Sequence, residues 1–234
     1  DKTLEKINKH EVTILCDENK GLSFARKIGS EKASGDYILF IGPDNILDKN
    51  FIKKYIKNFK KYKFDSATTF TRVKNPLTIW DKGLDQRWKS LISKPGLREI
   101  IGTPGLYKKE CFEKVSFSSQ DLGPCDDTLF SQRLLAAGFT IGVVPLTIYD
   151  QNNSNFKTTW ERFKWYGTGD YKFFTYNMKD WSFQRKIKSI LHPYIQFLVH
   201  SFMSLKQFNF IGVFFCFFTM LARYFGWLSM LIKN

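Results

Sequence analysis

Short apolar runs and longer amphipathic segments alternate along this chain, a pattern that predicts alternating strands and helices. Apolar runs bounded by Gly, Pro or polar residues predict strands at 12–16, 37–41, 64–70 and 140–144. Helical spacing predicts helices at 3–9, 22–32 and 50–63. Segment 71–99 holds two prolines and has no long period, so we expect it to be a loop-rich insertion. Together these elements indicate an α/β domain.

The predicted helix at 50–63 has one apolar face and one basic face. After Asp48, which we take as its N-cap, apolar side chains recur at helical spacing at Phe51, Ile52, Tyr55, Ile56 and Phe59. Five lysines lie mostly on the other face. A helix that packs on the core and keeps its lysines in water explains this pattern better than contact with a membrane.

The end of the chain is strongly apolar. Segment 208–232 exceeds the roughly 20 apolar residues that cross a bilayer, and Arg223 is the one charge inside it. Segment 187–205 is also apolar but is interrupted by polar residues and a proline, so spanning, re-entrant and flat arrangements are all open. We expect a hairpin of two helices joined near Lys206. A helical subdomain buried in a soluble protein is the alternative, which the many phenylalanines disfavour.

Charge and composition narrow the choice of partners. The net charge of +14 comes from 36 basic and 22 acidic side chains, and anionic lipid, a nucleoside diphosphate or nucleic acid would balance it. Nucleic acid is the weakest of these candidates because no nucleic-acid-binding motif accompanies the charge. The four cysteines form no C-x-x-C pair and the three histidines are scattered, which disfavours a zinc site or a disulfide framework and suits a cytosolic face.

The strand predicted at 37–41 ends on a carboxylate in a tight turn. Gly42 and Pro43 follow the strand, and Asp44 is then offered at the edge of the sheet. Ligands of open α/β sheets bind outside the carboxyl ends of the strands, and Mg²⁺ is usually held by one or two carboxylates together with substrate phosphates. An ordinary turn, in which Asp is favoured for local hydrogen bonding, explains Asp44 equally well by itself.

The segment around this strand resembles the inverting family-two glycosyltransferases, which have the GT-A fold. Their usual pattern is Asn-x-Gly, Ala-Arg-Asn, Gly-Asp-Tyr and a hydrophobic strand that ends in Asp-x-Asp. This chain has the matching groups Asn19-Lys20-Gly21, Ala25-Arg26-Lys27, Gly35-Asp36-Tyr37 and Gly42-Pro43-Asp44. The resemblance implies that Lys20, Gly21, Arg26 and Asp44 bind the donor, with Asp44 also facing a metal ion. Lys27 replaces the usual Asn, and Gly42 replaces the first Asp, which faces the ribose in the family.

A second motif resembles the part of the family that carries the catalytic base. Segment 102–109 is similar to a strand and basic turn, and segment 123–134 is similar to a Glu-Asp motif at a helix start. An inverting transfer needs a base because the attacking hydroxyl must lose its proton. The resemblance assigns that role to Asp127, with Asp126 in place of the usual Glu as its support. Capping of the helix is the alternative explanation for both acids.

Two further segments extend the resemblance toward the carboxyl end. After the strand at 140–144 and a turn expected at Pro145, Asp150 lies where many relatives carry a His that binds the metal. Oxygen ligation suits Mg²⁺ or Mn²⁺, although a plain polar turn fits as well. Segment 158–167 resembles the aromatic and basic helix that precedes membrane segments, and Glu161, Lys164 and Trp165 loosely resemble a Gln-x-x-Arg-Trp signature. An interfacial helix is the simpler interpretation of this segment, and so loose a match to the signature does not imply that the enzyme makes a polymer.

The start of the chain resembles the end of a family element that normally follows two strands and a helix. Those strands form the floor under the base of the nucleotide, so we expect a truncated chain that lacks part of its donor pocket. The resulting expectation is a GT-A catalytic domain at 1–155, an interfacial helical segment at 156–186 and membrane helices at 187–234. The GT-A domain is a Rossmann-like mixed sheet flanked by helices.

The expected activity is transfer of a sugar, with inversion, from a nucleoside-diphosphate donor to a lipid-linked or cell-surface glycan acceptor. Mg²⁺ or Mn²⁺ is the expected cofactor, and nucleic acid is not an expected partner. The domain is expected at the cell membrane and facing the cytoplasm under the positive-inside rule. A GT-A binding or assembly module with impaired catalysis is the alternative that Gly42 and Lys27 suggest. A basic membrane-surface protein without a nucleotide site is a third.

Overall fold

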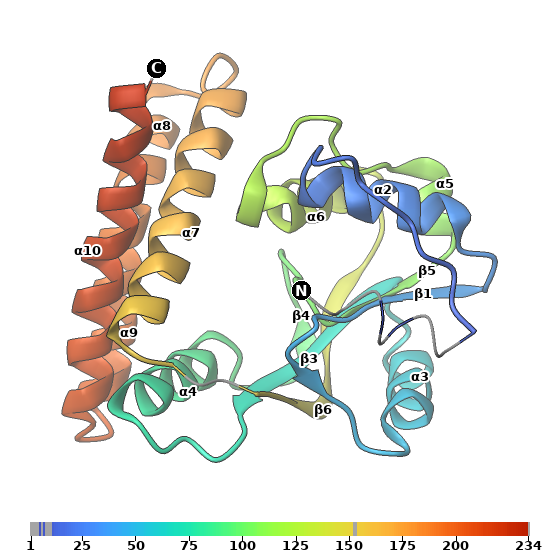
Figure 1. Ribbon diagram of the computed structural model, residues 1–234, viewed down its shortest axis with the longest axis horizontal. Coiled ribbons are helices and arrows are strands. Elements are labelled where there is room, and N and C mark those ends of the chain that lie inside the picture. Colours follow the sequence, from blue (N-terminus) through green and yellow to red (C-terminus); the bar gives the residue numbers. More distant parts are fainter. Residues whose placement is uncertain (1–4, 6, 8–10, 152–153, 234) are drawn as a thin grey trace.

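The computed structural model describes residues 5, 7, 11–151 and 154–233. It contains a mixed sheet flanked by helices and a separate layer of helices beside it (Figure 1). The first half runs α2 (Leu22–Lys32), β1 (Tyr37–Phe40), β2 (Asn45–Ile46), α3 (Phe51–Tyr62), β3 (Ser66–Val73), α4 (Ile79–Leu91), β4 (Gly96–Leu97) and β5 (Gly105–Lys108). The second half runs α5 (Glu110–Lys114), the 3-10 turn η1 (Gly123–Cys125), α6 (Asp126–Ala136), β6 (Ile141–Asp150), α7 (Phe156–Asn177), α8 (Phe183–Ile190), α9 (His192–Leu205) and α10 (Phe210–Lys233).

The sheet has the strand order β1-β5-β3-β6-β2, with β4 paired to β6. β3 and β6 are parallel, whereas the other pairs are antiparallel. Helix α3 covers one face of the sheet, and α2, α5 and α6 lie on the other side (Figure 1). The expected mixed sheet flanked by helices is therefore observed. Because β3 and β6 run parallel, their carboxyl ends lie at the same edge of the sheet. Strand β2 pairs with β6 at that edge.

Helix α3 packs on the core, as its amphipathic pattern predicts. Phe51, Tyr55 and Phe59 are buried against the sheet, whereas Ile52 is half-exposed. The predicted N-cap is wrong, because the cap is Asn50 and Asp48 contributes only its carbonyl, which accepts from the Phe51 N–H at 2.9 Å. The helix thus covers the sheet with its apolar face and leaves its lysines in water.

Strand β6 is longer than the sequence suggested. The predicted turn at Pro145 is wrong, because the strand continues to Asp150. The register with β3 is Thr68 to Val143 and then Phe70 to Thr147, so β6 has extra residues at a bulge around Pro145. A proline cannot donate a ladder hydrogen bond and is tolerated at such a bulge. Asp150 therefore ends a strand inside the sheet and does not lie in a polar turn.

The strand predicted at 12–16 is not observed, and the apolar side chains of this segment are exposed, since Val12 is 55% exposed. A strand needs a neighbour to satisfy its backbone groups, and no strand pairs with this segment within the described part of the chain. The helix predicted at 3–9 lies mostly outside the described residues.

The expected loop-rich insertion at 71–99 is instead the end of β3, helix α4 and strand β4. Helix α4 begins with a capping box, in which the Asp81 N–H donates to Thr78 Oγ1 at 3.0 Å and the Thr78 N–H donates to the Asp81 carboxylate at 3.3 Å. The Thr-x-x-Asp spacing of this box is a recognised helix-start signal. Its apolar residues Trp80, Leu84, Trp88 and Leu91 also recur at helical spacing, so the sequence did contain the signal for this helix.

The helical layer is held together by very close contact between α7 and α10. A Cβ atom on Gly167 would lie 1.9 Å from the carbonyl oxygen of Arg223, and one on Gly226 would lie 1.9 Å from that of Lys164. Within the same contact, the Arg223 guanidinium donates two hydrogen bonds to the Asp170 carboxylate, at 2.8 and 2.6 Å. The charge in the apolar tail is therefore neutralised by α7, and the glycines set the distance between the two helix backbones.

The predicted helical hairpin is observed, with α9 and α10 joined at 206–209. Among the described residues, α10 is the one helix long and apolar enough to cross a membrane, over Phe210–Ile232. Helix α9 has 14 residues and spans about 21 Å at 1.5 Å per residue, which is shorter than a bilayer core.

The replacement Gly167→Ala is expected to destabilise the folded chain by about 1–3 kcal/mol, because the added methyl group forces two helix backbones apart. The measurement is the free energy of unfolding in urea. Gly29→Ala is the matched control, since a Cβ at Gly29 meets nothing within 4 Å in the middle of α2. That control is expected to gain about 0.5–1 kcal/mol of stability. Equal effects of the two replacements would contradict the proposed close contact.

Candidate active site

A cleft with two lobes lies between the sheet edge, α2, α4 and α7. The β2 lobe, with a volume of about 820 Å³, contains Asp44, Asn45 and Asp150. The α6 lobe, about 390 Å³, contains Asp126 and Asp127. The two lobes share the lining residues Leu22, Arg26, Thr71, Trp88, Thr103, Trp165 and Tyr166. They are therefore two ends of one cleft, with a carboxylate pair at each end.

The β2 lobe places Asp44 and Asp150 close together through pairing of β2 with β6. Asn45 lies opposite Asp150 in the ladder, and its side-chain amide donates a short hydrogen bond to the Asp150 carboxylate. Burial is the main cause that raises the pKa of Asp150 to about 6, and the negative charge of Asp44 contributes to this rise. The Arg162 guanidinium lies 3.9 Å from the Asp44 carboxylate and opposes this effect. The β2 lobe therefore contains two neighbouring carboxylates, and Arg162 compensates their negative charge only in part.

Gly42 is part of this arrangement. Its N–H donates to Asn45 Oδ1 at 2.8 Å, which orients the amide that binds Asp150. A Cβ atom at Gly42 would lie 2.7 Å from Asp44 Oδ1. A larger residue would push the Asp44 carboxylate away from its present position. The space beside Asp44 therefore suits the glycine that this chain has in place of the first Asp of the family motif.

The α6 lobe is organised by Arg26, which extends from α2. Its Nη1 donates to Asp126 Oδ1 at 2.7 Å, and its Nη2 donates to Thr103 Oγ1 at 2.8 Å. The Asp126 side chain is 1% exposed, and its Oδ2 has no hydrogen-bond partner in the part of the chain that the structure describes. Burial raises the pKa of Asp126, while the charge of Arg26 lowers it. Arg26 is the cation that makes this buried acid tolerable.

Asp127 lies in the first turn of α6 and is partly exposed to the cleft. A Cβ atom on Gly102 would lie 2.8 Å from Asp127 Oδ2, so the absence of a side chain at Gly102 leaves room for this carboxylate. Burial, together with the negative charge of Asp126, raises the pKa of Asp127 to about 7. A carboxyl group with a pKa near neutrality can accept a proton from a bound reactant at physiological pH.

Helix capping does not account for the two acids of α6. The N-cap is Cys125, and no side-chain cap hydrogen bond is formed. Asp126 Oδ1 accepts instead from the N–H of Asp127 at 2.7 Å. The acids are thus oriented by Arg26 and by the adjacent backbone.

Three sequence-selected positions on or near α2 lie away from the cleft. Lys20 forms an exposed ion pair with Glu18 at 2.6 Å, and Gly21 begins α2 at a φ of 93° beside Asp121. Neither residue lines either lobe. Lys27 pairs with Glu31 at 3.7 Å on the surface of α2. Of the residues selected for donor binding, the structure brings together Arg26 and Asp44.

Several residues that line the cleft were not expected from the sequence. Trp88 comes from α4, whose capping box would have revealed the helix. Arg162 and Tyr166 come from α7 and flank the Trp165 that the sequence had highlighted. Positions 162, 165 and 166 share one side of a helix, so helical spacing from Trp165 was the available signal.

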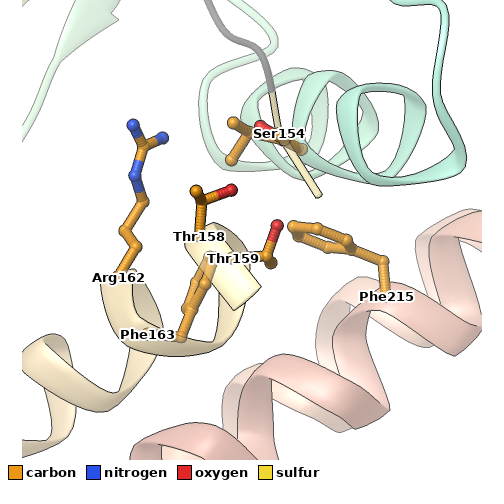
Figure 2. Close-up of a pocket in the computed structure, with 7 residues that line it drawn as sticks. Ser154, Thr158, Thr159, Arg162, Phe163 and Phe215 are labelled. Carbon is orange, nitrogen blue, oxygen red and sulfur yellow. The ribbon is translucent and has the colours of Figure 1, made fainter. Parts of the chain in front are cut away.

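A smaller cavity of about 210 Å³ lies between α4, α7 and α10 (Figure 2). Its lining includes Thr158, Thr159, Phe163 and Phe215, and it contains no carboxylate. In Figure 2 the guanidinium of Arg162 points away from the two phenylalanines. That guanidinium reaches toward Asp44 in the β2 lobe. The small cavity therefore belongs to helix packing, and the ionisable chemistry belongs to the two-lobed cleft.

The mixed sheet and its acid-lined cleft are the arrangement expected of a glycosyltransferase of the GT-A class, and the family comparison agrees with this expectation. Residues 1–116 match the family described as Glycosyl transferase family 2. This match covers just under half of the chain and agrees with the expected family, fold class and enzyme class.

Similar proteins of known identity come from Staphylococcus aureus. Poly-beta-1,6-N-acetyl-D-glucosamine synthase from strains COL and N315 is 28% identical over 152 residues, which cover 61% of this chain. The match spans 37% of the length of these curated relatives. The crystal structure of S. aureus TarS 1-349 aligns over all of this chain and 80% of that chain, with a TM-score of 0.49 and 11% identity. Its complex with UDP-GlcNAc aligns with a TM-score of 0.47 and 11% identity.

Proposed function

We propose that this chain is the catalytic part of a membrane-attached, inverting glycosyltransferase. It transfers a sugar from a nucleoside diphosphate to a hydroxyl of a lipid-linked or cell-surface glycan acceptor. The observation that carries this proposal is the single cleft with an acid pair in each lobe, lined at both ends by Arg26. One lobe suits a diphosphate with its cation, and the other suits a hydroxyl that must lose a proton.

In the α6 lobe, the proposed general base is Asp127. An acceptor hydroxyl that attacks the anomeric carbon transfers its proton to this carboxylate as the bond to the leaving diphosphate breaks. Asp126 and Arg26 position this base. Arg26 binds the buried Asp126 carboxylate at 2.7 Å, and that carboxylate accepts a hydrogen bond from the N–H of Asp127. The aromatic side chains of Trp165, Tyr166 and Trp88 line the same lobe and can exclude water from the reacting groups.

In the β2 lobe, Asp44 and Asp150 are the residues that would hold Mg²⁺ or Mn²⁺. The fit is supported by two neighbouring carboxylates whose repulsion contributes to the raised pKa of Asp150. No cluster of three or more His, Cys, Asp or Glu side chains suited to a metal occurs among the described residues, so substrate phosphates would complete the coordination. When bound, the ion would neutralise charge on the leaving diphosphate. Arg162 would add a second positive charge near Asp44.

The proposed donor is supported by the names of the relatives, and the proposed location is supported by helix α10 and the net charge. The curated relatives are named for an N-acetyl-D-glucosamine polymer, so UDP-GlcNAc is the first donor to test. The long apolar helix α10 and the net charge of +14 support attachment to an anionic membrane, with the domain on the cytoplasmic side. The deciding experiment is release of UDP from a panel of nucleotide sugars, with and without membranes, by the longest natural form of the chain. Donor binding without turnover on any acceptor would favour the impaired binding module.

Metal-dependent binding of UDP is expected to weaken by roughly tenfold between pH 7 and pH 5, because protonation of Asp150 removes one ligand charge. The sign follows from the pKa of about 6, above which Asp150 is ionised and below which it is neutral. Calorimetric titration with UDP and Mn²⁺ at several pH values measures the effect. Asp150→Asn is the matched control, since its remaining pH dependence belongs to the diphosphate and to other groups. Identical pH profiles for the two proteins would rule out Asp150 as a metal ligand.

A further inference from the structure

The three carboxyl-terminal helices each expose large apolar side chains, and we call these side chains together the tail face. On α10 these side chains recur every seven residues, at Phe214, Leu221 and Leu228. Phe202 and Leu198 extend the face onto α9, and Ile187 extends it onto α8. Exposed apolar surface of this extent marks an interaction site.

The opposite side of α10 is covered by the rest of the protein. Trp227 packs on α7, with its ring 5.3 Å from that of Tyr171, and Gly226 contacts the backbone of Lys164. Nearer the start of α10, Phe215 is 1% exposed and its ring lies 5.7 Å from that of Phe163 on α7. In Figure 1, α7 runs alongside α10, between α10 and the sheet. Helix α10 therefore cannot enter a lipid phase without α7.

Helix α7 is unsuited to the interior of a bilayer. It carries Glu161, Arg162, Lys164, Asp170 and Lys172 along the stretch that accompanies α10. Charged side chains are costly at the bilayer centre. The same helix also lines the catalytic cleft with Arg162 and Trp165, so a spanning α10 would carry the cleft into the hydrocarbon. The packing thus opposes a transmembrane orientation, although α10 is long enough for one.

We propose that the tail face lies flat in the headgroup region of one leaflet of an anionic membrane. This inference rests on the proposed membrane attachment and specifies its geometry. Only the apolar stripes enter the lipid, while α7 stays above the surface with the cleft. Charge favours an anionic surface, because the chain has a net charge of +14 and Lys188 is exposed on α8 beside Ile187. A basic amphipathic helix such as α8 is typical of interfacial binding.

The depth of α10 in vesicles tests this geometry. Nitroxide labels are placed at Phe214→Cys, Leu221→Cys and Leu228→Cys in the full chain, with Cys16 and Cys125 replaced by Ser and Ala. The vesicles contain phosphatidylcholine with phosphatidylglycerol. The three sites extend over about 21 Å of helix. A flat helix places all three at the same depth of about 5–10 Å, whereas a spanning helix places Leu221 about 15 Å deep and the other two near opposite headgroups.

A charge replacement provides an independent measurement with a matched control. Leu228 and Ile52 are 51% and 50% exposed, and Ile52 belongs to α3, a helix that lies far from α10 in Figure 1. Leu228→Asp is expected to weaken vesicle binding by at least about tenfold. Ile52→Asp is expected to leave binding within about twofold, because its site stays in water.

Each outcome separates the two proposals. Equal shallow depths with selective loss in Leu228→Asp support the flat geometry. A deep Leu221 label overturns the flat geometry and leaves membrane attachment standing. Labels that stay in water with every vesicle overturn membrane attachment itself. Labels immobilised without vesicles, together with a dimer mass by light scattering, show that a second copy of the chain covers the tail face and overturn the flat geometry as well.

Discussion

Replacing Asp127 with Asn is expected to lower kcat by about 10²–10⁴-fold, the usual contribution of a positioned general base. Asn has nearly the same shape as Asp but cannot accept the proton of an attacking hydroxyl. Donor affinity is expected to change little, because Asp127 lines the α6 lobe and the proposed diphosphate site is in the β2 lobe. The measurements are steady-state release of UDP and calorimetric binding of the donor.

The matched control for this prediction is Asp121→Asn. Asp121 precedes the same helix and pairs with Lys172 at 2.6 Å, but it does not line the cleft. Its replacement is expected to retain most of the turnover. Unchanged turnover in Asp127→Asn would remove Asp127 from the role of base, and an equal loss in both variants would point to a general structural effect.

The pH profile gives a second readout of the same residue. The pKa of Asp127 is raised to about 7, so the ionised base is depleted below that pH. Turnover of the wild-type chain is therefore expected to rise with pH between about 6 and 8 and then to level off. A profile without a step in this range would contradict the assignment of Asp127 as the base.

Replacing Arg26 with Met is expected to destabilise the folded chain by about 3–5 kcal/mol near pH 7, because it leaves a buried acid without its partner. Asp126 is 2% exposed, and Arg26 is the cation bound to it. The loss is expected to shrink as the pH falls. Without Arg26 the pKa of Asp126 rises further, and the protonated acid tolerates burial. Urea unfolding at pH 5 and pH 8 measures both the size and the direction of this effect.

Two comparison variants make the Arg26 experiment specific. Adding Asp126→Asn to the Met variant removes the buried charge and is expected to restore much of the lost stability. Lys27→Met removes a neighbouring cation whose pair with Glu31 is exposed, and its effect is expected to stay below about 1 kcal/mol. A double variant no more stable than the single variant would show that Arg26 acts through packing alone.

Much of the local structure could be predicted because its signals are local. Helix α2 has the predicted bounds, and the strand predicted at 37–41 is observed as β1. Gly42 and Pro43 end that strand and leave Asp44 at the edge, while α6 begins at Asp126 as expected. Turn residues and hydrophobic periodicity act over a few positions, so a single sequence contains them.

Two of the wrong predictions, the strand at 12–16 and the turn at Pro145, depended on contacts between distant segments. Segment 12–16 has the composition of a strand, but pairing requires a neighbour, which the described residues do not provide. Pro145 resembles a turn in sequence, yet a bulge against β3 absorbs it and lets β6 continue to Asp150. Pairing partners and register are properties of the whole sheet, so neither could be read from the segment alone.

By itself, the sequence determined the family motifs, the acids Asp44, Asp126 and Asp127, and the apolar character of the tail, because residue identity and short-range spacing define them. Only the tertiary structure decided which of these groups share a cleft. It placed Arg26 on the buried Asp126 and brought Asp150 beside Asp44 through the register of β2 and β6. Burial and neighbouring charge then raised the carboxyl pKa values, and both depend on chain segments about one hundred residues apart.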